Sequence, residues 1–244
     1  MVKQGIESAG FRLINRRRRW GVDHIDDICR IVGDPTKVDT IFDVGANVGN
    51  SALEYVSKFA QASVVSFEPI SETYEVLKKN TRKNLRINPV LTALGNEVGS
   101  SACAIHSDSR NNSLITDLKD QLHSSPVEVR TIPVTTLDVF KSEHGIGAID
   151  LLKIDTEGFD LAVLQGASRS LSSGEIKFVY VEFHQVVRRK SGAELGSLLE
   201  IANFLADHNY RFITAYTDSV HCDELMGTYN ALFLINKHPF SWLY

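Results

Sequence analysis

The stretch that decides the fold is TIFDVGANVGNSALEYVSKFA, residues 40–60. An apolar run ends at Asp43, a short turn with Gly45 and Gly49 follows, and a pattern with helical spacing begins at Asn50. A strand, a glycine-containing turn and a helix in this order form the usual nucleotide-binding unit of an α/β domain. We therefore predict a strand over 40–45 and a helix over 50–60, joined by a ligand-binding turn.

The chain continues with alternating strand and helix patterns on both sides of this unit. Further strands are expected at 63–69, 88–95, 149–158, 177–184, 211–217 and 230–237, and helices at 5–33, 70–84, 136–145, 159–174 and 192–210. Alternation of this kind predicts a doubly wound, mostly parallel sheet with right-handed crossovers. The last two strands are joined too tightly for a helical crossover, so we expect them to be antiparallel.

Between the third and fourth strands the pattern changes to period 2. Residues 100–106 and 127–137 read as short strands with a loop between them, which predicts a small β insertion. We expect an N-terminal helical extension over 1–38 and one catalytic domain over 39–244. The length of 244 residues suits a single α/β domain with additions.

Composition excludes several classes of protein. Hydrophobic residues make up 43% and charged residues 23%, so we expect an ordinary globular protein. The net charge is −4, which gives the protein as a whole no electrostatic attraction to nucleic acid. The opening residues lack the apolar core of a signal peptide, and no stretch has the length of a membrane span. The chain also has three scattered cysteines, Cys29, Cys103 and Cys222. These features together predict a reducing, cytoplasmic location.

One charge run stands out, Arg16, Arg17, Arg18 and Arg19, directly before Trp20. The simpler interpretation is the solvated face of an N-terminal helix. The alternative is a peripheral contact with an acidic surface, a phosphate or a lipid headgroup.

The turn itself indicates which nucleotide would bind. Its glycines are four residues apart and Asn47 stands where a dinucleotide-binding turn needs its middle glycine, and no GK[ST] follows. Asp43 would repel a pyrophosphate but suits a cationic group, and Glu68, at the end of the second strand, is placed to accept both ribose hydroxyls. A ribose and an ammonium without phosphate describe S-adenosylmethionine. The alternative is that Asp43 caps the helix and Glu68 is an exposed acid before Pro69.

Four segments together resemble the FkbM family of S-adenosylmethionine-dependent methyltransferases: FDVGANVGNSA, SFEP, IDLLKIDTEGFDLAVLQGA and VYVEFH. The resemblance covers about residues 39–185. It implies a Rossmann-like class I methyltransferase fold with a seven-stranded, mostly parallel sheet and an antiparallel C-terminal strand.

The resemblance also implies where the cofactor lies. Asp43 would hold the methionine amino group, and the turn over 45–49, with Ala46 and Asn47 inside it, would offer backbone N–H groups to the methionine carboxylate. Glu68 and Pro69 would lie at the ribose. Adenine would lie among Ile70, Leu94, Gly95 and Asn96, with Asn112, Ser113 and Leu114 from the insertion, although NNSL also reads as an ordinary turn.

Methyl transfer to a hydroxyl needs in-line alignment and removal of a proton. Asp155 and Glu157 share a face at the end of the fourth strand, and Glu182 and His184 repeat this spacing at the fifth. Lys153 lies on the face of Asp155 and would neutralise part of the charge. The alternatives are helix caps for the two acids of the fourth strand and a structural role for the histidine.

The acids would permit a divalent metal, but we favour catalysis without one, since no DxD or HxxxH spacing supports a site. The leading hypothesis is an O-methyltransferase that acts on a hydroxyl of a sugar in a surface glycan or glycolipid, or of a natural product. The alternatives are a non-catalytic cofactor-binding regulatory protein and a nucleic-acid methyltransferase, for which the arginine run is the sole support.

Overall fold

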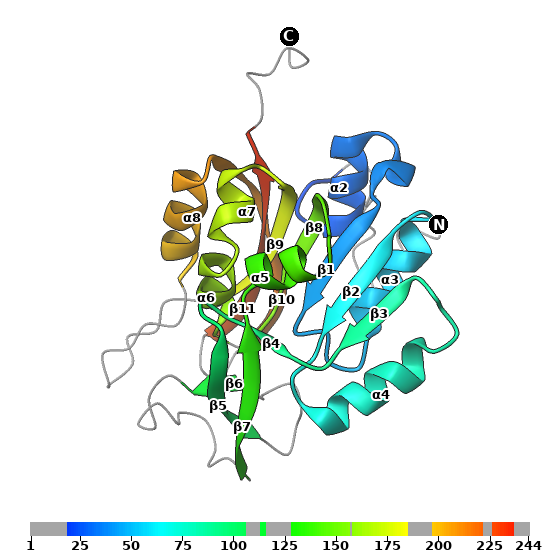
Figure 1. Cartoon of the computed structure of the whole chain (residues 1–244). Coiled ribbons are helices and arrows are strands. Elements are labelled where there is room, and N and C mark those ends of the chain that lie inside the picture. The colour runs from blue at the N-terminus through cyan, green and yellow to red at the C-terminus, as the bar shows by residue number, and fades with distance from the viewer. Residues whose placement is uncertain are drawn as a thin grey trace, which may run out of the picture.

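The computed structural model describes residues 19–105, 113–115, 128–156, 158–184, 197–221 and 226–236. Its centre is a seven-stranded sheet in the order β10-β11-β9-β8-β1-β2-β3 (Figure 1). All neighbours are parallel except β11, which runs antiparallel to both β9 and β10. The predicted architecture is therefore confirmed. The strands are β1 (Thr40–Val44), β2 (Ser63–Phe67), β3 (Ile87–Val90), β8 (Ile149–Ile154), β9 (Ile176–His184), β10 (Tyr210–His221) and β11 (Met226–Ile235).

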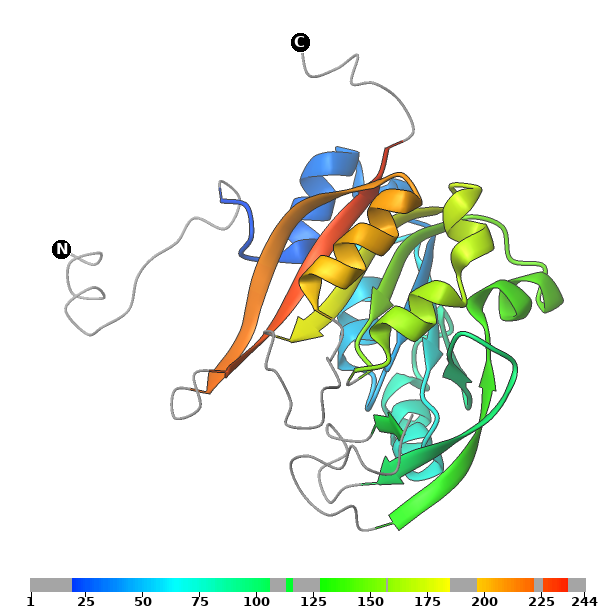
Figure 2. The same cartoon turned by 90° about the vertical axis from the view of Figure 1, so that its left-hand side faces the viewer.

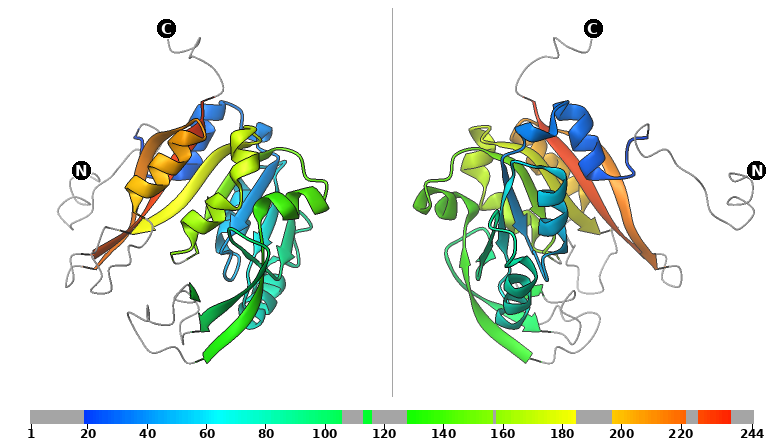
Figure 3. Two further views of the ribbon diagram at one scale, coloured as in Figure 1. Left: turned by 60° about the vertical axis from the view of Figure 1, so that its left-hand side comes forward. Right: turned by 90° about the vertical axis from the view of Figure 1, so that its right-hand side faces the viewer.

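Helices cover both faces of the sheet. On one face lie α2 (His24–Val32) and α3 (Asn50–Lys58), and on the other lie α5 (Leu137–Glu143), α6 (Asp160–Gln165), α7 (Ser168–Ser172) and α8 (Leu198–Asp207) (Figure 3). A further helix, α4 (Ser71–Thr81), packs against β3. No helix in the described part of the chain is long and apolar enough to cross a membrane.

The described part of the N-terminal extension packs onto the main core. Ile25 and Ile28 of α2 are buried in the same hydrophobic cluster as the central strands, as is Val38, which follows the short 3₁₀ helix η2 (Pro35–Lys37). Of the helix predicted over 5–33, the structure describes only this last part as α2; residues 1–18, with Arg16, Arg17 and Arg18, lie outside the described residues.

The strand predicted over 88–95 is two strands. The main sheet takes β3, and the chain then turns into β4 (Ala93–Leu94), which belongs to a second sheet in the order β4-β7-β5-β6. Pro89 fits β3 because β3 is an edge strand, where a missing N–H costs little. The second sheet contains β5 (Gly99–Ile105), β6 (Ser113–Ile115) and β7 (Glu128–Thr135), and it confirms the predicted insertion. It projects from one end of the main sheet (Figure 2).

The single helix predicted over 159–174 is broken into α6 and α7 around Gly166. A Cβ atom at this glycine would lie 1.9 Å from the carbonyl oxygen of Gly95, so two backbones touch here. The helix predicted over 192–210 begins at Leu198 in the structure, where Ser197 and Glu200 form a capping box; residues 185–196 are not among those described.

The carboxyl end of α3 is held by one side chain from another element. The Arg86 guanidinium, just before β3, donates to the carbonyl oxygens of Val56 at 2.7 Å and of Phe59 and Ala62 at 3.0 Å. The Val56 carbonyl lies in the last turn of the helix, where carbonyls lack intrahelical partners, and the other two follow the helix end. A cation at this position also complements the helix dipole.

Candidate active site

A row of polar side chains crosses four neighbouring strands. Ser66 of β2 lies in register with Asp43 of β1, Asp43 with Lys153 of β8, and Lys153 with Tyr180 of β9. Residues in register point to the same face of a sheet, which here is the face under α2 and α3. Ser66, Asp43 and Lys153 are buried. This row of four residues, of which Asp43 and Lys153 are charged, therefore lies beneath the glycine turn.

Lys153 is the centre of this row. Its Nζ lies 3.0 Å from Oδ1 of Asp43 and 3.4 Å from Oδ2 of Asp155, and it donates to the carbonyl oxygen of Gly45 at 3.0 Å. Burial opposes the ammonium charge, but the two carboxylates outweigh it and raise the pKa of Lys153 above its ordinary value. One cation thus ties the ends of β1 and β8 together. The predicted placement of Lys153 beside Asp155 agrees with this geometry.

Asp43 has no exposed surface; its Oδ1 is paired with Nζ of Lys153 at 3.0 Å, and its carboxylate accepts no hydrogen bond from any other described residue. Burial raises the pKa of Asp43, while the charge of Lys153 acts in the opposite direction. The interpretation of Asp43 as a helix cap is wrong, because the N-cap of α3 is Gly49 and no side chain caps this helix. Its contact with a methionine amino group stays a prediction, and it would need neighbouring side chains to move.

Glu68 is buried, so the interpretation as an exposed acid is wrong. One carboxylate oxygen accepts the N–H of Asn47 at 3.1 Å and the other accepts the N–H of Ile70 at 2.9 Å. Burial raises the pKa of Glu68 to about 7, although these two N–H groups act in the opposite direction. A carboxylate has about four acceptor positions. Two therefore remain for a pair of ligand hydroxyls.

The backbone of the turn is engaged within the protein. The N–H groups of Gly45 and Ala46 donate to the Phe67 carbonyl oxygen at 3.1 and 2.9 Å, the N–H of Asn47 goes to Glu68, and that of Gly49 goes to Ala46. The prediction that these N–H groups face a methionine carboxylate is wrong for all four, because the turn folds back on the end of β2. No side chain caps the first turn of α3, so the N–H groups of this turn could bind an anion.

Both glycines of the turn are required by close packing. Gly45 has a φ of +75°, and a Cβ there would lie 1.8 Å from the carbonyl oxygen of Asp155. Gly49 has a φ of +92°, and its Cβ would lie 2.7 Å from Cδ1 of Leu77. Close approach of neighbouring segments therefore explains both glycines.

A residue that we did not predict organises the loop after β8. Asp160 is buried and accepts the N–H groups of Thr156 at 3.1 Å and Gly158 at 3.2 Å. Burial, and next the charge of Asp155, raises the pKa of Asp160 to about 6. The predicted alternative of Asp155 as a cap is wrong, since the N-cap of α6 is Phe159 and no side chain caps it.

The remaining predicted catalytic residues are described only in part. Glu182 is buried on β9, two residues after Tyr180 and so on the same face. The backbone of His184 pairs with Thr228 of β11, but its side chain lies outside the described residues, as does all of Glu157. Asp155, whose side chain is 41% exposed, is thus the accessible carboxylate of the described group.

The predicted adenine residues divide between two hydrophobic clusters. Ile70 is buried with Ala93 and Cys103 under the second sheet, whereas the side chain of Leu94 lies in the main core. Leu94 could therefore contact adenine only through its backbone. The N–H of Gly95 donates to the carbonyl oxygen of Thr135. Pro69 is half-buried beside Glu68. The structure describes Ser113 and Leu114 only as backbone in β6, and Asn112 is outside the described residues.

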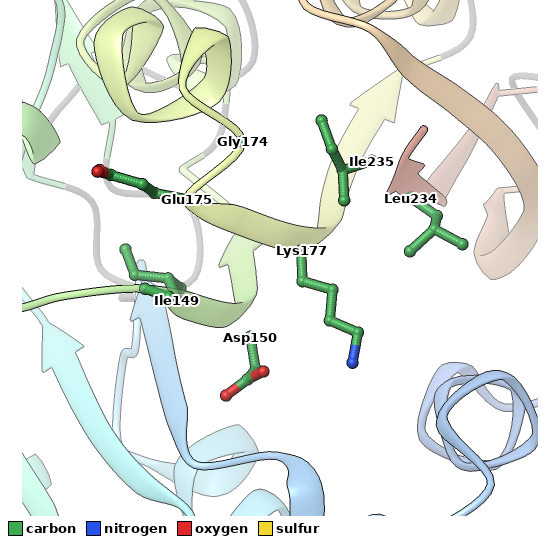
Figure 4. Close-up of a pocket in the computed structure, with 8 residues that line it drawn as sticks. Ile149, Asp150, Gly174, Glu175, Lys177, Leu234 and Ile235 are labelled. Carbon is green, nitrogen blue, oxygen red and sulfur yellow. The ribbon is translucent and has the colours of Figure 1, made fainter. Parts of the chain in front are cut away.

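A pocket of about 290 Å³ lies at the other end of the sheet, at the amino ends of β8 and β9 (Figure 4). Asp150 on its wall accepts the N–H groups of Asp39 and Thr40, which is a structural use of the carboxylate. Ligands of open α/β sheets bind at the carboxyl ends of the strands. We therefore place the active site at the glycine turn. Among the described side chains no three His, Cys, Asp or Glu residues converge to hold a metal ion.

Comparison with known proteins agrees with this geometry. The Methyltransferase FkbM domain matches residues 43–212. The chain belongs to the FkbM methyltransferase family. This confirms the resemblance and identifies the glycine turn, Glu68 and the end of β8 as parts of an FkbM domain, whose methyl donor is S-adenosylmethionine. Both α2 and β11 lie outside the matched range.

Two curated relatives, from two different organisms, are similar to part of this chain. Methyltransferase sdnD of Sordaria araneosa is 28% identical over 171 residues, 59% of this chain and 64% of that protein. Hexuronic acid methyltransferase AglP of Haloferax volcanii is 25% identical over 185 residues, 75% of this chain and 72% of that protein. The chain thus spans about two thirds of the length of these relatives.

A solved structure also aligns with the FkbM domain protein. It is magnesium protoporphyrin IX methyltransferase (ChlM) from Synechocystis PCC 6803, with a TM-score of 0.47 and 9% identity over 96% of this chain and 98% of that chain. A similarity at this level adds nothing to the assignment.

Proposed function

We propose that the protein is an S-adenosylmethionine-dependent O-methyltransferase that acts on a hydroxyl of a sugar, in a surface glycan or glycolipid, or of a natural product. The observation that carries the proposal is the position of two acids on either side of the glycine turn. Glu68 is buried with acceptor positions left for a ribose, and Asp155 is partly exposed beside Lys153. Membership of the FkbM family supports methyl transfer, and the name of AglP supports a sugar acceptor.

The described residues fit this cofactor. Oδ2 of Asp43 lacks a hydrogen-bond partner among the described residues, which suits a nearby ammonium group, and the first turn of α3 lacks a cap, which suits a carboxylate. Glu68 suits two hydroxyls. When bound, S-adenosylmethionine supplies an electrophilic methyl group whose leaving group is neutral.

The chain itself has to orient the acceptor and remove its proton. We assign the proton to Asp155, because its carboxylate is accessible while that of Glu182 is buried. Nζ of Lys153 lies 3.4 Å from the Asp155 carboxylate and helps to orient it. Glu157 and His184 remain further candidates at the same edge of the sheet.

The experiment offers methyl-labelled S-adenosylmethionine and three acceptor sets: glycans that contain uronic acids, glycolipids and neutral glycans, and hydroxylated natural products. Mass spectrometry then locates the label. Asp155→Asn should lower kcat by about 10²–10⁴-fold, the usual cost of losing a general base, whereas Asp207→Asn, at the exposed end of α8, should not. Tight cofactor binding without transfer to any set would favour the non-catalytic alternative, and label on RNA would favour the nucleic-acid one.

A further inference from the structure

A second polar row crosses the carboxyl end of the sheet, two residues beyond the row that contains Lys153. Glu182 of β9 lies in register with Asn230 of β11, and Asn230 with Tyr216 of β10. Residues in register point to the same face of a sheet. The hydroxyl of Tyr216 donates to Asp27 of α2, so this is the face under α2. Asn230 and Tyr216 lie outside the matched FkbM range.

The second row begins at the assigned proton acceptor, Asp155. This residue follows Ile154, which lies in register with Val181, so Asp155 lies level with Glu182. Its carboxylate lies 3.4 Å from Nζ of Lys153 and so points to the same face. Neighbouring strands are about 4.8 Å apart, so Asn230, two strands away, lies roughly 10 Å from Asp155. An acceptor molecule at Asp155 that extends across β9 therefore reaches Asn230.

Asn230 is unusual for its position. The interior strand β11 lies between β9 and β10, and residues 231–235 are all apolar and buried. Asparagine is depleted in strands. Its side chain is half-buried, and its amide makes no hydrogen bond with another described residue. The amide thus keeps two donors and one carbonyl oxygen for a ligand.

The course of α2 leaves Asn230 accessible. The helix begins at His24, whose ring stacks on Tyr180 of the first row at 3.9 Å between centroids, and it leads through η2 to the amino end of β1. It thus runs away from the carboxyl end of β9 (Figure 3). Because the hydroxyl of Tyr216 is used by α2, the amide of Asn230 is the group of this row that can bind a ligand beside Glu182.

We propose that Asn230 is a specificity-determining residue, which hydrogen-bonds one hydroxyl of the acceptor while the hydroxyl to be methylated lies at Asp155. An amide that donates and accepts matches a hydroxyl group, which does both as well. The acceptor class is therefore polyhydroxylated, a sugar residue and not an apolar molecule with a single hydroxyl. This inference rests on the proposed O-methyl transfer and adds to it the choice of acceptor.

Saturation-transfer NMR tests the contact without turnover. The probes are the methyl glycosides of glucuronic acid and of glucose, each added with S-adenosylhomocysteine. Wild type should bind at least one of them, and Asn230→Leu should weaken that binding about two- to ten-fold, the equivalent of one hydrogen bond between uncharged groups. Asn88→Leu is the matched control, because this asparagine is exposed on β3 at the opposite end of the sheet, and it should bind as wild type does.

Steady-state kinetics then use the acceptor that takes the methyl label. Asn230→Leu should raise the KM of this acceptor by a similar factor and leave kcat and the Kd of S-adenosylmethionine unchanged, a split that a general loss of structure would not give. If Asn230→Leu does not fold, Asn230→Ala, which adds no bulk, gives the same comparison.

Equal sugar binding and equal acceptor KM in wild type and a folded Asn230 variant overturn the proposal, as does label on an acceptor with a single hydroxyl. Sugar binding that depends on Asn230, without transfer to any acceptor, would instead contradict the proposed methyl transfer and leave the sugar subsite standing.

Discussion

Nζ of Lys153 lies 3.0 Å from Oδ1 of Asp43, and both side chains are almost completely buried. Removal of one partner from such a pair leaves an uncompensated charge in the interior. We therefore expect Lys153→Met to lower the free energy of unfolding by about 3–5 kcal/mol in urea denaturation. Lys78→Met, which breaks the exposed pair with Glu75 on α4, is the matched control and should leave the stability nearly unchanged.

Glu68→Gln should weaken the binding of S-adenosylmethionine by about 1.5–3 kcal/mol, because hydrogen bonds to a charged group are worth this much. The amide keeps the shape of the side chain but loses the charge and half of the acceptor capacity. Calorimetry gives the affinity, and Glu75→Gln, exposed on α4, is the control. Equal affinities in Glu68→Gln and wild type would rule out Glu68 as the ribose ligand.

The affinity for S-adenosylmethionine should depend on pH through Glu68. Its pKa in the folded protein is about 7, against an ordinary value of 4.5. Ribose hydroxyls bind the ionised form, so affinity should rise by up to about ten-fold per pH unit below pH 7 and level off above it. Without ligand the sign is opposite: the contribution of this group to stability is complete below about pH 4.5 and is lost as the pH rises through 7. A flat affinity profile from pH 5.5 to 8 would contradict the assignment, and Glu68→Gln should give one.

Gly45→Ala should destabilise the protein more than Gly33→Ala does. Both glycines have a positive φ near +75°, which costs a residue with a side chain about 1–2 kcal/mol. Only at Gly45 does the new Cβ meet backbone, the carbonyl oxygen of Asp155, which adds about 1–3 kcal/mol of overpacking. Thermal and urea unfolding of the two variants measures the difference. Equal losses would show that the turn adjusts without disturbing the end of β8.

Asp160→Ala should disturb the loop after β8. It leaves two N–H groups, of Thr156 and Gly158, without their acceptor, and an unsatisfied buried group costs about 1–3 kcal/mol. Because Asp155 precedes this loop, kcat should fall along with stability. Asp207→Ala at the exposed end of α8 should change neither.

The sheet could be predicted from sequence because apolar strands and turn residues alternate strongly between 40 and 184. The errors fall where a tertiary contact overrides a local pattern. Gly166 lies at the break between α6 and α7, where a side chain would clash with the carbonyl of Gly95, and the pattern of the two helices does not contain this information. Residues 88–95 form two strands because β4 pairs with β7, about forty residues later in the chain.

The acids of the site could be predicted for a related reason, since carboxylates at the ends of neighbouring strands meet at one edge of a sheet. Their hydrogen-bond partners could not. The turn N–H groups go to Phe67 and Glu68 because the turn folds back on β2, which no spacing reveals. Asp160 could have been found, since an acid next to a glycine loop at the start of a helix often accepts loop N–H groups.

The hydrogen bonds of Arg86 at the carboxyl end of α3 affect how much of the methyl-donor site must be ordered on binding. Gly49 fixes the first turn of this helix against Leu77, and the guanidinium fixes the last. The helix is therefore anchored to its neighbours at both ends. The helix that follows the glycine turn is thus held in place before a ligand arrives, so little binding energy is spent on ordering it.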